Sequence, residues 1–309
     1  MRRHAARGLP EAPKWAWVAI VVALIAIAVM APIALNRGQV PAASNAASSA
    51  VATPSAGQQL HSAPAVDPGS LGAQADVADA IDQLLTYDLD GGKVLLALPP
   101  EPRPRLVVYL HGATQGAASV VADPEVAGAV AAVLQAGYPV LAADAGGNSW
   151  GNEQALDDYT AAVADAAERT GASDVVLWAE SMGGLPALQL LDSAQLAVPV
   201  VAFAGVYPVC DLSSMQDNPA VGSQIPTAYG PDLDDALRRL SPAPITRPAP
   251  MLLWASPEDT VVPKAENADV CAEKMRAAGG RVDVIETRGE HGDPSNFDGA
   301  RLVAFVDAA

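Results

Sequence analysis

Cysteine and histidine are both scarce in this 309-residue chain, which has two cysteines and four histidines. Cys210 and Cys271 cannot supply a four-cysteine zinc site, and the sequence has no C-x-x-C motif. With so few histidines, only a handful of positions offer a general base that works near neutral pH. Neither a metal nor an organic cofactor is implied.

Basic residues are in short supply as well. Lysine and arginine together number 18, against 35 aspartates and glutamates, which gives a formal net charge of −17. Nucleic-acid binding depends on clustered lysine and arginine side chains, so no nucleic-acid partner is expected. The same balance argues against adhesion of the folded part to an anionic membrane surface.

Charge is absent altogether from residues 15–35, which read WAWVAIVVALIAIAVMAPIAL. A helix of this length spans about 30 Å, the thickness of a bilayer hydrocarbon core. Basic residues within 1–14 predict that this N-terminus stays inside and that a single transmembrane anchor places the rest outside. The alternative is a cleaved signal peptide and a secreted domain, although the apolar core of a signal peptide is usually shorter, about 7–15 residues.

Residues 36–75 are rich in alanine, serine and proline and show no sustained apolar period. Such a stretch buries too little apolar surface to offset its ordering entropy, which predicts a disordered linker. One folded domain is then expected over residues 76–309, with no internal repeat.

Within that domain, short apolar runs alternate with helix-like stretches. Apolar strands without alternation are typical of parallel sheets buried on both faces, and their spacing predicts a doubly wound α/β domain. A hairpin is expected over 86–99, with Asp90-Gly91 as its turn. Further strands are expected at 105–112, 138–144, 174–181, 198–207, 249–256 and 281–287, and helices at 124–137, 153–171, 264–278 and 297–307.

Ligands of such sheets bind at the carboxyl ends of the strands, which directs attention to Ser181. Residues 174–184 read DVVLWAESMGG, an apolar strand followed by a serine and then by small residues. This resembles the nucleophile elbow, G-x-S-x-G, of the α/β-hydrolase family, with Ala179 in place of the first glycine. A serine that only caps a helix is the alternative. The resemblance implies an α/β-hydrolase fold with a mostly parallel central sheet, helices on both faces and a small lid.

In that family the catalytic residues follow the chain order serine, acid, histidine. Asp259 lies in WASPEDTVVP, directly after an apolar strand, and resembles the family's strand–turn–Asp-x-Val pattern. Glu258 and Asp211 compete for the role of the acid, since Asp211 follows the preceding strand.

Only one histidine occupies a position suited to a general base. His4 precedes the apolar span, and His61 lies in the linker. His111 precedes the serine and is expected to shape the loop after its own strand. His291, in TRGEHGD after the last strand, is therefore the expected base.

The resemblance also implies an oxyanion hole made of two backbone N–H groups. The first is expected from Met182, directly after the serine. The second is expected from the loop that follows the strand at 105–112, with Ala113 as first choice and Thr114 as second.

We therefore expect an extracytoplasmic serine hydrolase that cleaves carboxylic esters or related acyl bonds through Ser181, His291 and Asp259 and an acyl-enzyme. Its expected partners are a small-molecule or polymeric acyl substrate and, through the N-terminal helix, the membrane. The stretch LHGATQ (110–115) looks like that of secreted polyester depolymerases and feruloyl esterases. Three alternatives remain: a prolyl-oligopeptidase-type serine peptidase, a cell-envelope acyltransferase, and a non-catalytic tethered binding module.

Several residues around the expected site allow two interpretations. Residues 211–248 are the only room for a lid and contain one expected short helix, which favours an open site. Cys210 and Cys271 form either a disulfide outside the cytoplasm or two buried thiols. Trp150 either lines the pocket or packs in the core. Glu180 either disfavours anionic substrates or forms a salt bridge without functional meaning.

Overall fold

The computed structural model describes residues 73–193 and 195–309. The predicted membrane anchor at 15–35 lies outside the described residues, as does the predicted linker up to residue 72. Helix α2 (Ala73–Ala80) spans the domain boundary expected at residue 76. Within the described part of the chain, no helix is long and apolar enough to cross a bilayer.

The domain is built on one eight-stranded sheet. In chain order its strands are β1 (Gln83–Leu89), β2 (Gly92–Leu98), β3 (Arg105–Leu110), β4 (Val140–Ala143), β5 (Asp174–Glu180), β6 (Val200–Val206), β7 (Met251–Ala255) and β8 (Val282–Glu286). Across the sheet they lie in the order β1-β2-β4-β3-β5-β6-β7-β8. The pairs β1–β2 and β2–β4 are antiparallel, and every other pair is parallel. The predicted hairpin and the mostly parallel sheet are both confirmed.

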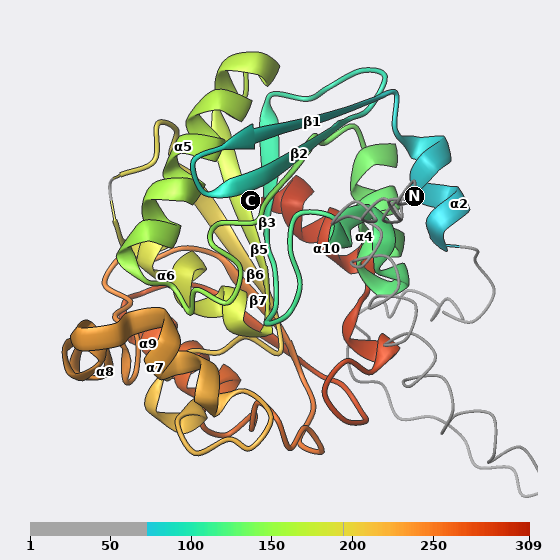
Figure 1. Ribbon diagram of the computed structural model, residues 1–309. Helices are drawn as coiled ribbons and strands as arrows, with labels where there is room; N and C mark the ends of the chain where they lie inside the picture. The colour runs from blue at the N-terminus through green and yellow to red at the C-terminus, as the bar shows by residue number, and fades with distance from the viewer. Residues whose placement is uncertain (1–72, 194) are drawn as a thin grey trace, which may run out of the picture. The chain divides into compact units, whose positions relative to one another are not determined.

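Helices cover both faces of this sheet (Figure 1). One face carries α5 (Glu153–Thr170), α6 (Gly184–Asp192) and α9 (Ala268–Ala277), and the other carries α2, α3 (Ser119–Ala122), α4 (Pro124–Gln135) and α10 (Gly299–Ala308). Successive side chains of a strand point to opposite faces. In β3, Leu106 and Val108 therefore join the core beneath α5 and α6, whereas Val107 and Tyr109 join the core beneath α4.

Local signals explain where the long helix α5 begins and ends. The side chain of Asn152 accepts a hydrogen bond from the Ala155 N–H, which satisfies one of the unpaired donors at the helix start. Gly171 ends the helix with φ of 67°, a conformation that glycine adopts at little cost. The helix expected over 153–171 is therefore confirmed.

The segment between β6 and β7 contains more helix than expected. Besides α8 (Leu233–Leu240) it holds α7 (Ile225–Tyr229) and three 3₁₀ turns. A five-residue helix is too short for apolar periodicity to reveal it. The segment is tied down through Trp150, whose carbonyl accepts from the Tyr229 hydroxyl at 2.6 Å. Trp150 is only 1 % exposed, so its side chain packs in the core and does not line an open pocket.

A disulfide joins Cys210, shortly after β6, to Cys271 in α9. Both side chains are buried, and 61 residues separate them in the chain. The disulfide therefore holds the start of the segment at 211–248 against the helix that follows β7. Closing a loop of this length restricts the unfolded chain and so stabilises the folded state.

Removing the disulfide is expected to destabilise the domain. The chain-entropy estimate for such a loop is about 4 kcal/mol, an upper figure when the unfolded chain retains structure. The double variant Cys210→Ala/Cys271→Ala should show a lower melting temperature than the oxidised wild type in differential scanning fluorimetry. A reductant should lower the melting temperature of the wild type and leave that of the double variant unchanged. Equal sensitivity of the two proteins to reductant would contradict this role of the disulfide.

Candidate active site

Ser181 stands at a sharp turn between β5 and α6. Strand β5 ends at Glu180, Ser181 takes φ of 49°, and a short 3₁₀ turn (Ser181–Gly183) leads into α6. A positive φ is unfavourable for a residue with a side chain and persists only where the surroundings impose it. The turn therefore shows the strained geometry expected of a nucleophile elbow.

The small residues around Ser181 are required by close backbone contacts. A Cβ atom on Gly183 would overlap the carbonyl oxygen of Leu110 in β3, so this position admits only glycine without a shift. A Cβ atom on Gly184 would likewise crowd the carbonyl of Val209. Ala179 lies fully buried within β5, where its methyl group fits the core. The departure from glycine at this position is therefore compatible with the turn.

Ser181, His291 and Asp259 form a continuous chain of hydrogen bonds. His291 Nε2 lies 3.1 Å from Ser181 Oγ, and His291 Nδ1 lies 2.8 Å from Asp259 Oδ2. An ionised carboxylate can only accept, so Nδ1 carries the proton and Nε2 is free to accept from the serine hydroxyl. The three residues follow β5, β7 and β8, whose carboxyl ends meet at the same edge of the sheet.

The carboxylate of Asp259 is buried and held in place by its own loop. Asp259 Oδ1 accepts hydrogen bonds from the backbone N–H groups of Val261 and Val262, at 2.9 and 2.8 Å. This leaves Oδ2 directed at His291. The competing carboxylate of Asp211 accepts instead from Ser213 within its own turn. The geometry thus pairs Asp259, and not Asp211, with the histidine.

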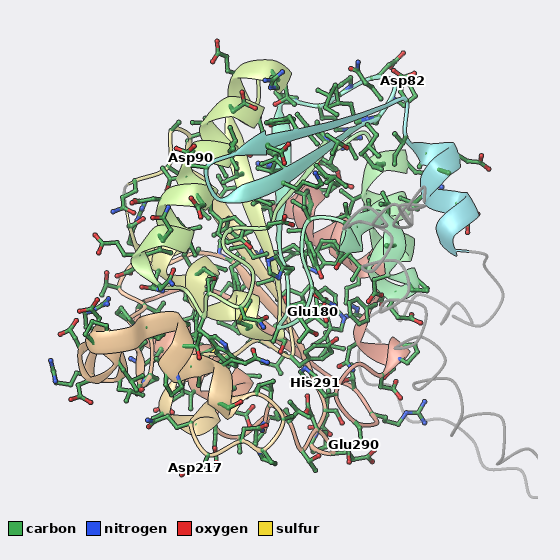
Figure 2. The ribbon with its side chains drawn as sticks, viewed as in Figure 1. Asp82, Asp90, Glu180, Asp217, Glu290 and His291 are labelled. Carbon is green, nitrogen blue, oxygen red and sulfur yellow. A yellow bond between two sulfur atoms is a disulfide. The ribbon has the colours of Figure 1, made fainter. Side chains whose placement is uncertain are left out.

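Two exposed glutamates tie the loop of the acid to the loop of the histidine. Glu258 accepts from the Gly289 N–H at 2.8 Å, and Glu290 accepts from the N–H and hydroxyl of Thr260 at 3.1 and 2.8 Å. Each glutamate is adjacent in sequence to a member of the Asp259–His291 pair. This reciprocal bonding fixes the spacing of the two loops. In Figure 2, Glu290 is labelled just beyond His291.

The loop after β3 contains a backbone N–H without a hydrogen-bond partner in the described part of the chain. The Thr114 N–H donates to Asn148 Oδ1 at 2.6 Å, which makes it unavailable to a substrate. Within the described part of the chain, the Ala113 N–H has no hydrogen-bond partner. Met182 lies in the first turn of its 3₁₀ segment, where N–H groups have no partner inside the helix. Ala113 and Met182 thus retain the free donors that an oxyanion hole needs.

His111 belongs to the framework of this loop. It is 1 % exposed, and its ring nitrogens lie 2.8 Å from the Gly112 carbonyl and 2.9 Å from the Asp144 carbonyl. The Asp144 carboxylate in turn accepts from the backbone N–H groups of Lys93 and Ala117. His111 therefore joins the ends of β3 and β4, and its ring makes no contact with the Ser181–His291 pair in the described structure.

Glu180 is buried beneath the site in a cluster of neutral hydrogen-bond donors. Its carboxylate accepts from Tyr109 at 2.5 Å, from Tyr207 at 3.0 Å and from Gln115 at 3.1 Å. Neither interpretation of Glu180 from the sequence anticipated this arrangement, because its partners are uncharged and it is 6 % exposed. Burial raises the pKa of this carboxyl above its usual range, although the donated hydrogen bonds oppose the shift.

The same cluster reaches the loop after β3. Gln115 Oε1 accepts from the Gly112 N–H at 2.7 Å, while Gln115 Nε2 donates to Glu180. The loop that contains Ala113 is thereby fixed to the residue just before the serine. No group of three or more side chains suited to holding a metal ion is present among residues 73–193 and 195–309.

Comparison with known proteins gives matches of structure rather than of sequence. No protein-family model matches the chain, and no curated protein matches it. A truncated carbohydrate esterase from gut microbiota superimposes with a TM-score of 0.61 at 17% identity, covering 74% of this chain and 97% of that one. The chain has the α/β-hydrolase fold.

Two further structures with this fold differ in size. An esterase of Pyrococcus furiosus matches with a TM-score of 0.54 and 18% identity, over 76% of this chain and 94% of its own. A puromycin-hydrolyzing peptidase of Mycobacterium tuberculosis matches with a TM-score of 0.54 and 19% identity, over 71% of this chain and 38% of its own. The α/β-hydrolase fold predicted from the elbow is therefore confirmed, and identities this low establish the fold alone.

Sequence reasoning missed the residues that support the site from below. Tyr207 and Gln115 carry no motif, and each acquires its role only through contacts with Glu180. A signal did exist at Glu180, since a charged residue at the end of an otherwise apolar strand requires hydrogen-bond partners once buried. The identity of those partners depends on the order of strands in the sheet.

The buried carboxyl of Glu180 should make stability depend on pH. Below its ordinary pKa of 4.5 the group is protonated in both states, and above 4.5 the unfolded chain loses the proton while the folded chain retains it. Stability therefore falls as pH rises through this window. Because Glu180→Gln lacks this titration, its melting temperature relative to wild type should increase with pH from 4 upward. A difference in melting temperature that is constant with pH would refute the raised pKa.

Proposed function

We propose that this protein is a serine hydrolase of carboxylic esters or related acyl bonds, with Ser181 as nucleophile, His291 as general base and Asp259 as the acid that orients it. The observation that carries the proposal is the unbroken hydrogen-bond chain from Asp259 through His291 to Ser181. A serine hydroxyl is a weak nucleophile until an adjacent base accepts its proton. A neutral imidazole oriented by a buried carboxylate is such a base.

In the proposed reaction, Ser181 Oγ attacks the acyl carbonyl carbon as its proton passes to His291 Nε2. Asp259 stays ionised and stabilises the imidazolium through Nδ1–H. The tetrahedral intermediate expels the alcohol, which takes the proton from His291, and an acyl-Ser181 ester remains. Water then attacks this ester with His291 again as base, and release of the acid restores the free serine.

The negative oxygen of the tetrahedral intermediate requires donors that are already in place. The N–H groups of Met182 and Ala113 are our choice, because neither is engaged within the described residues, whereas the Thr114 N–H is bonded to Asn148. Backbone donors of this kind cost no reorganisation during the reaction. Loss of one typically lowers the rate by about 10²–10³-fold.

Two of the solved structures that share the fold are esterases, which supports an ester as the substrate. The esterases that share the fold are covered over 97% and 94% of their length, whereas the puromycin-hydrolyzing peptidase is covered over only 38%. This domain therefore corresponds to nearly the whole of those esterases and to one part of that peptidase. We propose ester hydrolysis from the likeness to these esterases, and a matched amide substrate tests the alternative of a peptidase.

We also propose that the domain works outside the cytoplasm, attached to the membrane through residues 15–35. The disulfide between Cys210 and Cys271 supports an oxidising compartment, since the cytosol keeps most thiols reduced. The uncharged stretch at 15–35, preceded by basic residues, supports an anchor with the domain on the far side. Protease protection in spheroplasts tests this: cleavage of the domain by added protease supports the proposal, and full protection contradicts it.

The proposed mechanism predicts how a fluorophosphonate probe reacts with the full chain in detergent. Wild type should be labelled, Ser181→Ala should not, and His291→Ala should react about 10²–10⁴-fold more slowly, because the base no longer removes the serine proton. Labelling is measured as the rate of probe incorporation on a gel. Absence of labelling in a folded wild type would overturn the proposal and favour the tethered binding module.

Asp211 provides a matched control for the proposed catalytic acid, Asp259. Asp259→Asn should slow labelling strongly, because an amide in that position no longer stabilises the imidazolium. Asp211→Asn removes a carboxylate that bonds only within its own turn, so its labelling rate should stay close to that of wild type. Comparable losses in both variants would argue against Asp259 as the acid.

A further inference from the structure

Tyr207 occupies a strained position immediately after β6. Its φ is 34°, a value that is exceptional for an aromatic residue. Strain of this kind persists only when several contacts impose it, and it gathers at functional sites. Tyr207 is 2 % exposed, so its ring is enclosed rather than presented to solvent.

Those contacts reach all three segments that supply the proposed catalytic residues. The Tyr207 hydroxyl donates to Glu180, the residue before Ser181, at 3.0 Å. Its backbone N–H donates to the carbonyl of Trp254 in β7, the strand that leads to Asp259, at 2.7 Å. Its ring packs on the ring of His291, with 4.1 Å between centroids and a tilt of 50°.

The same ring contacts the loop of the histidine a second time. The rings of Tyr207 and Phe297 stand edge to face, with centroids 6.0 Å apart and planes at 81°. Phe297 lies just ahead of α10, so the Tyr207 ring contacts the loop between β8 and α10 both at His291 and near its end. Figure 2 labels Glu180 and His291 one below the other, and Tyr207 links the two through the contacts above.

The ring of Tyr207 suits a histidine that becomes positively charged. The face of an aromatic ring carries negative electrostatic potential and attracts a cation within about 6 Å of its centroid. In the proposed mechanism, His291 is an imidazolium while it holds the proton of Ser181.

We propose that Tyr207 is a positioning residue whose ring holds the His291 ring toward Ser181 and favours the imidazolium formed during the reaction. This inference rests on the proposed function. A contribution made only when the imidazolium exists stabilises the transition state and not the bound substrate, so it acts on kcat and leaves KM unchanged.

The test compares two replacements of Tyr207 in the full chain, with hydrolysis of a chromogenic acetyl ester as the readout. Tyr207→Leu removes the aromatic face and should lower kcat by about 3–30-fold with KM essentially unchanged. Tyr207→Phe keeps the face and loses only the hydroxyl, so it should restore most of the wild-type kcat. A kcat for Tyr207→Leu equal to that of wild type, or a Tyr207→Phe variant as slow as Tyr207→Leu, would overturn the proposal.

A matched control separates this effect from the general cost of losing a buried tyrosine. Tyr138 is 5 % exposed, precedes β4 at the opposite end of the sheet, and donates to Asp307 at 2.6 Å. Tyr138→Leu should lower the melting temperature and leave kcat unchanged. A fall in kcat as large as that of Tyr207→Leu would mean that kcat only reports stability, and would contradict the proposal.

Two further measurements keep the outcomes distinct. If Tyr207→Leu fails to fold, Tyr207→Met replaces it, since methionine fills irregular space without offering an aromatic face. Failure of the wild type to hydrolyse the ester and to react with a fluorophosphonate would refute the proposed function itself. An active wild type with an equally active, folded Tyr207→Leu or Tyr207→Met would refute the role of Tyr207 alone.

Discussion

The parallel arrangement of β3 and β5 to β8 is the constraint on which the rest of the structure depends. Because the carboxyl ends of these strands meet at one edge, residues 110 positions apart in the chain come within hydrogen-bond distance, as Ser181 and His291 do at 3.1 Å. The close approach of β3 to the turn after β5 then requires glycine at position 183. Helices on both faces bury the strands, and the polar groups gather where the strands end.

Around that edge the structure uses polar groups in two different ways. Exposed glutamates at 258 and 290 bond across from one loop to the other and fix the separation of Asp259 and His291. Buried groups also connect loops of the site. Glu180 bonds to both Tyr207 and Gln115, and through them it links His291 to the loop that contains the proposed oxyanion donor Ala113. Each proposed catalytic group is therefore held from at least two directions, which reduces the reorganisation that the reaction would require.

Much of the fold and the central residues of the site could be predicted from the sequence, and the reasons are local. The apolar strands, the cap at Asn152 and the turn at Ser181 each depend on a few neighbouring residues. Scarcity made His291 identifiable, since no other histidine follows the serine. The supporting contacts could not be predicted in the same way. Tyr207 contacts Glu180 and His291 only because of the order of strands in the sheet. Helix α7 is too short for its sequence to show an apolar periodicity.

The positive φ of Ser181 sets backbone stability against the need for a side chain at this position. Glycine adopts this conformation at the lowest cost. At the position of the proposed nucleophile, the backbone is therefore less stable with serine than it would be with glycine. A glycine there would relieve the strain and abolish the nucleophile at once. Backbone stability and the proposed activity therefore make opposite demands on this residue, and Ser181 meets the second at the cost of backbone strain.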